Sequence, residues 1–458
     1  MTAIDARDAP FLAGSRPPPK RARFLPPRVA ADNPFETFPL AAYEQPVWRA
    51  PSLFARAWMI NDPAGIRQVL IDNVANYPKM PMERRFFRAL FGDGLLSSEG
   101  ETWRTHRRIM APSFDPRSVA SYSQAMVDAS TAFASEWGRL EDGAETNVSD
   151  DMTRLTLEII SRTMFSADAA AMTGVTGLAL EKSLEQAFNL SLLDILPGIS
   201  KLRMAKRERD MAQIFAPMDG ALKALIESRR ANPGKLDLLG RLVAALDEET
   251  GARLTAQEVR DEVLTIFVAG HETTASAMTF IWYVLSQHPE WETKLHAELD
   301  SVLGGRPATD ADLPRLSLTR RIVEEAMRLY PPAPGLSGRV ALKADEIAGT
   351  RIPAGALVLI SSWVLHRHRE LWDDPNLFDP DRFLPERSAG RPRFAYLPFG
   401  GGARVCIGQM LAMNESILIL ATLAQRFRLR MRPDHRVVIQ HRITIRPRGG
   451  LPMTITRR

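Results

Sequence analysis

The chain has 458 residues, of which 45% are hydrophobic and 25% are charged, and its formal net charge is +5. This composition is typical of a globular protein with a sizeable core and excludes a disordered or low-complexity chain. Its single cysteine excludes an internal disulfide and any metal site built from several cysteines.

Residues 1–32 form a polar, proline-rich lead, in which Pro17-Pro18-Pro19 and Pro26-Pro27 disfavour a helix. No apolar run of signal or transmembrane length occurs, so we expect a protein without a membrane anchor. The scarcity of cysteine suits the reducing cytoplasm, where we place the protein. From residue 33 to 458 we find no repeat and no linker, and we expect one domain and a monomer.

The predicted elements change character along the chain. Residues 47–50 and 55–60 are short apolar runs that predict a hairpin, and residues 63–330 have mainly helical periodicity, with helix starts at Ser118, Ser149 and Thr255. Residues 340–362 predict strands with turns at Gly349 and Gly355, and further strands follow Phe427. The fold class is therefore mainly α with a smaller β region.

One predicted helix is unusually long. Thr255 and Glu258 form a capping-box pattern, and apolar periodicity continues from there to His288, where Pro289 ends it. Its middle reads Ala269-Gly270-His271-Glu272-Thr273-Thr274, in which glycine costs about 1 kcal/mol of helix stability. A threonine hydroxyl there can bond a carbonyl one turn back and open a groove for oxygen and water.

The C-terminal region is strongly basic. Residues 426–458 contain ten arginines and one acid, Asp434. The alternation from Arg442 to Arg446 predicts a half-exposed sheet edge with its arginines pointing outward. No nucleic-acid-binding module or aromatic interleaving accompanies this charge, so we expect no nucleic-acid partner.

The only cysteine, Cys406, lies in a glycine-rich loop that runs from Phe399 to Gly408 and is followed by an apolar helical stretch. The start of a helix favours negative charge, which predicts a thiolate at this position. A buried apolar cysteine and a cysteine nucleophile are the alternatives. No protease signature surrounds Cys406, and the pattern of covalent haem attachment is absent.

This loop resembles the haem-binding loop of the cytochrome P450 superfamily, and the positions that match it are Phe399, Gly402, Arg404, Cys406 and Gly408. The resemblance extends over nearly the whole chain from Asn33. It implies a soluble, bacterial-type haem-thiolate enzyme with the single-domain P450 fold. Haem b would lie between the long central helix and the helix after the cysteine, with Cys406 as the axial iron ligand.

The resemblance also assigns roles to other residues. Thr273 matches the proton-handling threonine of the family and Glu272 the neighbouring acid. Reduced dioxygen needs protons on its outer oxygen before the O–O bond breaks, and a hydroxyl with a carboxylate can supply them. Ala269 lies one turn before Thr273 and would line the haem pocket.

Two further sets of residues follow from the resemblance. The spacing of Glu325 and Arg328 is common in this chain, but the family has a structural Glu–Arg pair at this place, and Arg382 would complete a buried network with it. The expected cations and donors for the haem propionates are Trp103, Arg107, Arg404 and Arg339. Trp103 and Arg107 lie one helical turn apart and can clasp one carboxylate.

The implied activity is that of a monooxygenase, which uses O2 and inserts one oxygen atom into a small apolar organic substrate. Electrons would come ultimately from NAD(P)H through a separate ferredoxin or flavodoxin-type donor, which could dock on the basic residues Arg104, Arg108, Arg391 and Arg393. The expected pocket includes Phe86 and Phe87, within the segments 80–96, 188–196 and 333–336, together with Leu451. A peroxide-driven peroxygenase and a non-catalytic haem-binding sensor are the alternatives.

Overall fold

The computed structural model describes Lys20 and residues 33–50, 56–166, 199–232, 234–235, 237–441 and 443–458. The predicted lead, apart from Lys20, lies outside the described residues, as do the expected pocket segment 188–196 and Arg442. Among the helices described, none combines the length and apolar character needed to cross a membrane. The cytoplasmic location stays a prediction.

The prediction of a mainly helical chain with small sheets is confirmed. The α-helices of the described residues are α2 (Pro63–Arg67), α3 (Pro81–Phe91), α4 (Gly100–Met110), α5 (Pro116–Trp137), α6 (Val148–Phe165), α9 (Ile199–Ala231), α10 (Leu238–Ala244), α11 (Ala256–Gln287), α12 (Pro289–Leu303), α13 (Ser317–Leu329), α14 (Ser362–Leu365), α15 (Pro385–Ser388) and α16 (Gln409–Ala424). The strands are β1 (Val47–Ala50), β2 (Ala57–Ile60), β3 (Glu145–Asn147), β4 (Arg339–Val340), β5 (Asp345–Ile347), β6 (Thr350–Ile352), β7 (Leu357–Leu359), β8 (Phe427–Met431), β9 (Ile439–His441), β10 (Ile445–Pro447) and β11 (Pro452–Arg457).

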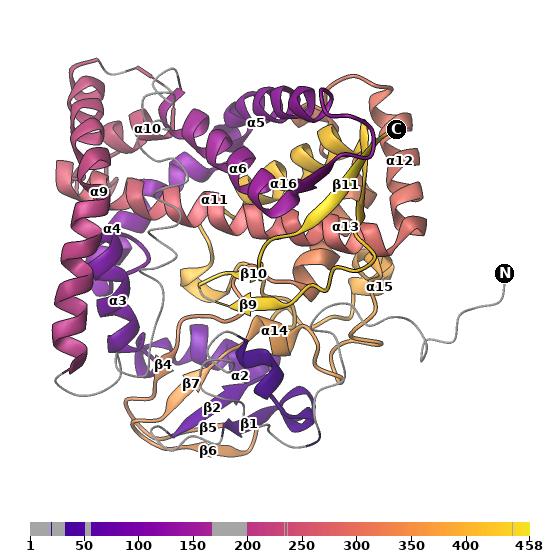
Figure 1. Ribbon diagram of the computed structural model, residues 1–458. Coiled ribbons are helices and arrows are strands. Elements are labelled where there is room, and N and C mark those ends of the chain that lie inside the picture. The colour runs from indigo at the N-terminus through magenta and orange to yellow at the C-terminus, as the bar shows by residue number, and fades with distance from the viewer. Residues whose placement is uncertain are drawn as a thin grey trace.

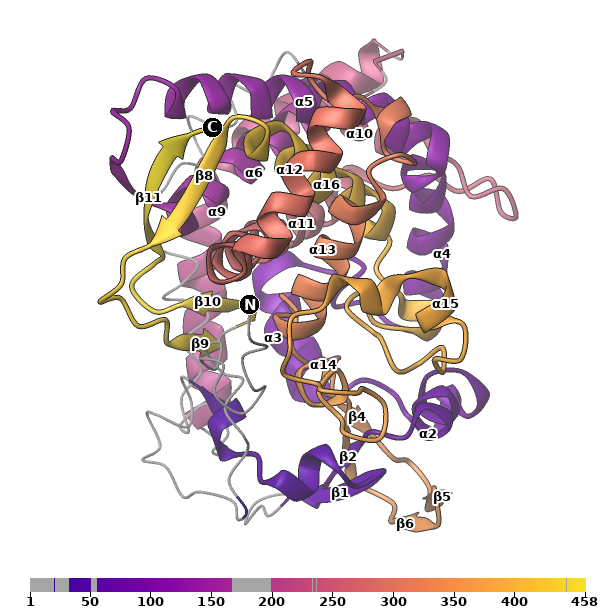
Figure 2. The same ribbon diagram turned by 90° about the vertical axis from the view of Figure 1, so that its right-hand side faces the viewer.

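The long helix α11 crosses the middle of the molecule, with α5 and α16 above it, α9 upright along the left side, and the strands β1 and β2 below it (Figure 1). The view from the side shows the same division, with α5, α12 and α16 near the top and the strands β1 and β2 at the bottom (Figure 2). The bottom sheet has the strand order β1-β2-β7-β4, and the predicted hairpin pairs Val47 with Ile60 in antiparallel register.

The remaining strands form small sheets. β3, β11 and β8 make a three-stranded sheet, and β9–β10 and β5–β6 are antiparallel pairs. Gly349 and Gly355 have φ angles of 73° and 76°, which explains glycine at the two predicted turns. The strands predicted between residues 340 and 362 and after Phe427 are confirmed.

The helix starts are confirmed at one position and corrected at two. Thr255 and Glu258 form the predicted capping box at the start of α11. By contrast, α5 begins at Pro116 with Asp115 as its cap, and α6 begins at Val148 with Asn147 as its cap. The serines predicted to start these helices instead donate their backbone N–H groups to the capping side chains, because an Asx side chain just upstream captures the free donors of the first turn.

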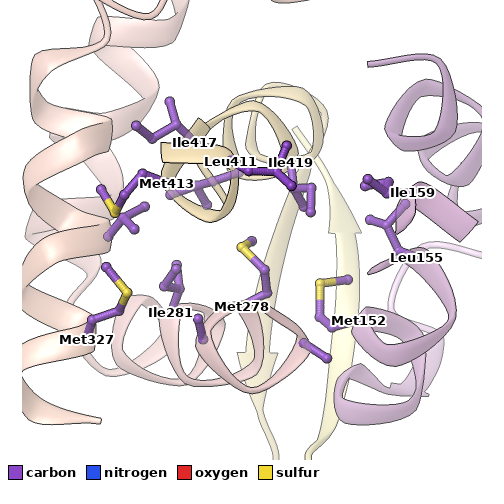
Figure 3. Close-up of a cluster of buried hydrophobic side chains, with 14 of the residues drawn as sticks. Met152, Leu155, Ile159, Met278, Ile281, Met327, Leu411, Met413, Ile417 and Ile419 are labelled. Carbon is purple, nitrogen blue, oxygen red and sulfur yellow. The ribbon is translucent and has the colours of Figure 1, made fainter. Parts of the chain in front are cut away.

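A buried layer joins α16 to α11. Figure 3 shows apolar side chains from four helices meeting here: Met152, Leu155 and Ile159 of α6, Met278 and Ile281 of α11, Met327 of α13, and Leu411, Met413, Ile417 and Ile419 of α16. Flexible methionines fill the irregular space between the helices. This packing holds the start of α16, and with it the loop that carries Cys406, beside the central helix.

Candidate active site

The central helix α11 has one accessible stretch in an otherwise buried course. Residues 263–268 and 274–285 are buried, whereas Ala269 is exposed and Gly270, Glu272 and Thr273 are partly exposed. The accessible stretch coincides with the predicted oxygen-activation segment.

The side chains of this stretch have separate partners. Thr273 donates its hydroxyl hydrogen to the carbonyl of Ala269 at 2.7 Å, which is the back-bond predicted from the sequence. Glu272 accepts a hydrogen bond from Thr444 Oγ1 at 2.8 Å and pairs with Arg446, whose Nη2 lies 3.2 Å from the same carboxylate oxygen. The helix stays continuous through this segment, so the predicted opening of its ladder stays a prediction.

The prediction that Arg446 points outward from a sheet edge is wrong. Its side chain is 21% exposed and contacts Glu272, because β10 lies against α11 with this face of the strand turned inward. Sequence reasoning therefore missed both Thr444 and Arg446 as partners of the acid. Their alternation with Ile443 and Ile445 was the available signal, but alternation alone does not tell which face is buried.

The Cys406 loop is held close to two parts of the chain. Gly402 has a φ of 70°, and a Cβ added there would lie 2.5 Å from the carbonyl oxygen of Leu70. Arg107 of α4 donates from Nη1 to the carbonyl of Val405 at 3.0 Å, and the amide of Cys406 donates to Phe399 at 2.9 Å. Glycine at position 402 is thus required by both backbone conformation and space.

The side chain of Cys406 is accessible at its surface, but many protein atoms lie around its sulfur at longer range. This desolvation raises the pKa of the thiol above its ordinary value. The amide of Gly408 and the charge of Arg107 act in the opposite direction but do not compensate. The thiolate predicted from the sequence at this position stays a prediction here.

Three cations gather near this loop. Burial, together with the neighbouring cations, lowers the pKa of Lys79 to about 7 and that of Arg404 to about 10. Arg339 is buried, and its Nε has no hydrogen-bond partner among the described residues. Glu99 lies 3.5 Å from Arg404 and balances only part of this charge. The cluster is therefore suited to receiving further negative charge.

Lys79 was missed by sequence reasoning. It is buried, and its ammonium group donates to the carbonyl of Leu96 at 2.8 Å. The signal that could have found it is a lone lysine in the short segment Tyr77-Pro78-Lys79-Met80-Pro81, directly before α3. The nearest acid along the chain, Glu83, affects the pKa of Lys79 less than burial and the neighbouring cations do, so the tertiary structure decides the surroundings of this lysine.

Trp103 and Arg107 contact different parts of the Cys406 loop. The guanidinium carbon of Arg404 lies 4.0 Å from the centroid of the Trp103 ring, which is a cation–π arrangement. Arg107 reaches Val405 instead. Helix α4 therefore contacts the loop at two points. The binding of one haem carboxylate by both Trp103 and Arg107 stays a prediction.

The three residues expected to form a buried network do lie together. Arg328 pairs with Glu325 through Nε–Oε2 at 2.6 Å and Nη2–Oε1 at 2.8 Å, and Arg382 Nε lies 3.4 Å from the same carboxyl group. Arg328 also donates to the carbonyls of His366 and Pro375. This network connects α13 to the segment that precedes the Cys406 loop.

The structure does not support two smaller expectations. Arg108 pairs with Asp247 at 2.9 Å and holds the pKa of that carboxyl to about 2, so it adds little free positive charge to a docking face. Arg391 stacks on Trp372, with 4.3 Å to the ring centroid. Leu451, expected in the substrate pocket, is fully buried in the core because β11 begins beside it.

The residues present fit a haem. An accessible cysteine lies in the glycine-rich loop. An accessible stretch also lies in the otherwise buried helix α11, against which α16 packs. The cluster of Lys79, Arg339 and Arg404 suits the two carboxylates of a haem, and the unpartnered Nε of Arg339 is the clearest sign of a missing anion. Fold and site together define a haem-thiolate protein.

Comparisons with known proteins agree with this class. The family model of cytochrome P450 matches residues 25–451. Cyclooctat-9-en-7-ol 5-monooxygenase from Streptomyces melanosporofaciens is 34% identical over 427 residues, 86% of this chain and 88% of that protein. Pentalenene oxygenase from Streptomyces avermitilis is 36% identical over 359 residues, 76% of each. The crystal structure of the cytochrome P450DA heme domain superposes with a TM-score of 0.79 at 29% identity and covers 90% of both chains.

The chain belongs to the cytochrome P450 family. It is an oxidoreductase of the P450 monooxygenase type, which uses haem with a cysteine thiolate ligand and O2. Cys406 is the only cysteine that the sequence offers for this ligand.

Proposed function

We propose that this protein inserts one oxygen atom from O2 into an apolar organic substrate, with haem b held by Cys406 and electrons from a separate protein donor. The observation that carries the proposal is that an accessible Cys406 in its glycine-rich loop occurs together with accessible residues of α11 (Ala269, Glu272 and Thr273) and with a cation cluster whose charge Glu99 balances only in part. Two electrons and two protons enter for each substrate oxidised, and the second oxygen atom leaves as water.

When bound, the haem would supply the reductive activation of O2, from which the substrate receives one oxygen atom. Within the protein, Cys406 provides the sulfur ligand, and Lys79, Arg339 and Arg404 bind the carboxylates of the haem. The hydroxyl of Thr273 and the carboxyl of Glu272 carry protons from solvent to the site of chemistry. Trp103 and Arg107 keep the Cys406 loop in place through Arg404 and Val405.

The substrate we propose is a hydrocarbon or a lightly oxygenated hydrocarbon. The names of two relatives contain pentalenene, an alkene, and cyclooctat-9-en-7-ol, an alkenol. Several partly accessible residues of the expected pocket segments are also apolar, namely Phe87, Leu95, Leu96, Ala333 and Leu336, although Glu83 and Asp93 are partly accessible there too. Burial of apolar ligand surface against such apolar side chains is favourable, and these side chains offer few hydrogen bonds to a polar ligand.

We propose a ferredoxin- or flavodoxin-type donor, supplied in turn by NAD(P)H. The face on which this donor docks would include fewer than the four arginines first expected, because Arg108 pairs with Asp247 and Arg391 stacks on Trp372. Arg393 is exposed beside Phe394, which packs against the loop at Gly401, so it remains a candidate contact for an acidic donor. Reversal of its charge should slow reduction at low salt and have little effect at high salt.

A ligand screen on the haem-loaded protein tests the proposal. Apolar cyclic alkenes should shift the haem spectrum from low to high spin, and the bound compound should be oxygenated when a donor system is added. Thr273→Ala should divert electrons from product to hydrogen peroxide. Unchanged coupling in that variant would favour the peroxide-driven alternative, and absence of product with every donor would favour the sensor.

A further inference from the structure

The acid proposed to relay protons is held by a segment far along the chain. The β9–β10 pair lies beside α11, beneath it in the view of Figure 1. Thr444 donates to Glu272 Oε1 at 2.8 Å, and Arg446 Nη2 lies 3.2 Å from that same oxygen. Two donors on one oxygen give the carboxylate a defined position.

The backbone between these donors is itself anchored to the helix. Ser276, one turn after Glu272, donates its hydroxyl hydrogen to the carbonyl of Ile445 at 2.7 Å in a buried contact. The amide of Ile445 donates to the carbonyl of Pro332 at 3.0 Å. Thr444 and Arg446 therefore approach Glu272 from a backbone that cannot shift without loss of two hydrogen bonds.

The pair is placed where charge matters. The side chains of Arg446 and Glu272 are 21% and 13% exposed, so water screens their attraction less than it does at the surface. Arginine stays charged throughout the accessible pH range, so Arg446 presents a cation to Glu272 across that range. Thr273, the next residue, donates its hydroxyl hydrogen to the carbonyl of Ala269, whereas the partners of the Glu272 carboxyl group among the described residues, Thr444 and Arg446, come from outside the helix.

We infer that Arg446, assisted by Thr444, is a positioning residue for proton delivery: it holds the carboxyl group of Glu272 aligned so that it can take a proton from solvent and pass it toward Thr273. This inference rests on the proposed function. A carboxylate without this partner is free to swing among several rotamers, and each misplaced orientation interrupts proton supply.

The test compares haem-loaded Arg446→Gln, Arg446→Lys and the control Arg448→Gln, which removes one exposed arginine from the same segment. In Arg446→Gln, product formed per NAD(P)H should fall about tenfold, less than the ~100-fold expected for loss of a proton-transfer group itself. Hydrogen peroxide should rise, and the solvent deuterium isotope effect on product formation should increase. Arg446→Lys should recover most of the coupling, and Arg448→Gln should keep it.

A double-mutant cycle separates this role from a general loss of structure. In a Glu272→Gln background, Arg446→Gln should add no further loss of coupling, and the two substitutions should shift the urea unfolding midpoint less than the sum of their single effects. Additive effects on both measurements, or an unchanged isotope effect in Arg446→Gln, would overturn the inference. Failure of the proposed function would be visible separately, because the parent protein would form no product.

Discussion

Arg328 and Glu325 form a two-pronged ion pair in which neither side chain is exposed to solvent. The guanidinium of Arg328 also reaches three backbone carbonyls, those of His366, Pro375 and Leu377. One buried arginine thus organises the connection between α13 and the chain that leads to the Cys406 loop.

Replacement of Arg328 by Met should destabilise the protein by about 3–5 kcal/mol, because the carboxyl group of Glu325 and three carbonyls lose their partner in the core. Urea unfolding measures the change. Arg104→Met is the matched control, since Arg104 pairs with Glu101 at the same sequence spacing but both side chains are more than 60% exposed. The control should change stability by less than about 1 kcal/mol. Equal effects of the two substitutions would contradict the prediction.

Gly402→Ala should strongly reduce haem retention. Its φ of 70° and the 2.5 Å approach of an added Cβ to Leu70 require the loop to move, which costs roughly 1–3 kcal/mol or more. Gly390→Ala serves as control, because nothing lies within 4 Å of an added Cβ there. The haem content of the purified variants reports the difference. A fully loaded Gly402→Ala protein would show that the loop tolerates a side chain.

Arg339→Met should change haem affinity and the stability of the haem-free protein in opposite directions. Removal of one buried cation relieves its repulsion of Lys79 and Arg404, so the apoprotein should gain stability. Haem should bind more weakly, because a carboxylate loses its partner. Urea unfolding of the apoprotein and haem transfer to an acceptor protein measure the two effects. A less stable apoprotein would indicate that Arg339 has a purely structural role.

Glu415 should make stability fall as the pH rises. Burial raises the pKa of its carboxyl to about 8, and its Oε1 has no hydrogen-bond partner among the described residues. Because the folded-state pKa lies above the ordinary value, this contribution to stability is complete below pH 4.5 and is lost as the pH rises through 8, at up to about 1.4 kcal/mol per unit. Between pH 5 and 7.5, the parent should lose about 2–3 kcal/mol more than Glu415→Gln. Parallel pH profiles would contradict this.

Several features of the molecule follow from local sequence alone. The capping box at Thr255 and Glu258 needs only residues three apart, and it occurs as predicted. Glycines at 349 and 355 are at turns because the positive φ there is a local requirement. The Cys406 loop, with its glycines and arginine, indicated a haem-thiolate protein from sequence alone. The residues that place a single cysteine ligand lie within a few positions of it, so their pattern is visible in the local sequence.

Other features depend on contacts between distant segments. The pairing of Glu272 with Thr444 and Arg446 joins residues more than 170 positions apart, and no local pattern shows which face of β10 turns inward. Lys79 becomes part of a cation cluster only when α3, β4 and the Cys406 loop meet. The desolvation that raises the pKa of the Cys406 thiol is not visible in the local sequence, because it depends on the number of protein atoms that surround the sulfur. Chain order determines the chemical groups and their local geometry, whereas burial and long-range electrostatics exist only once the chain has packed.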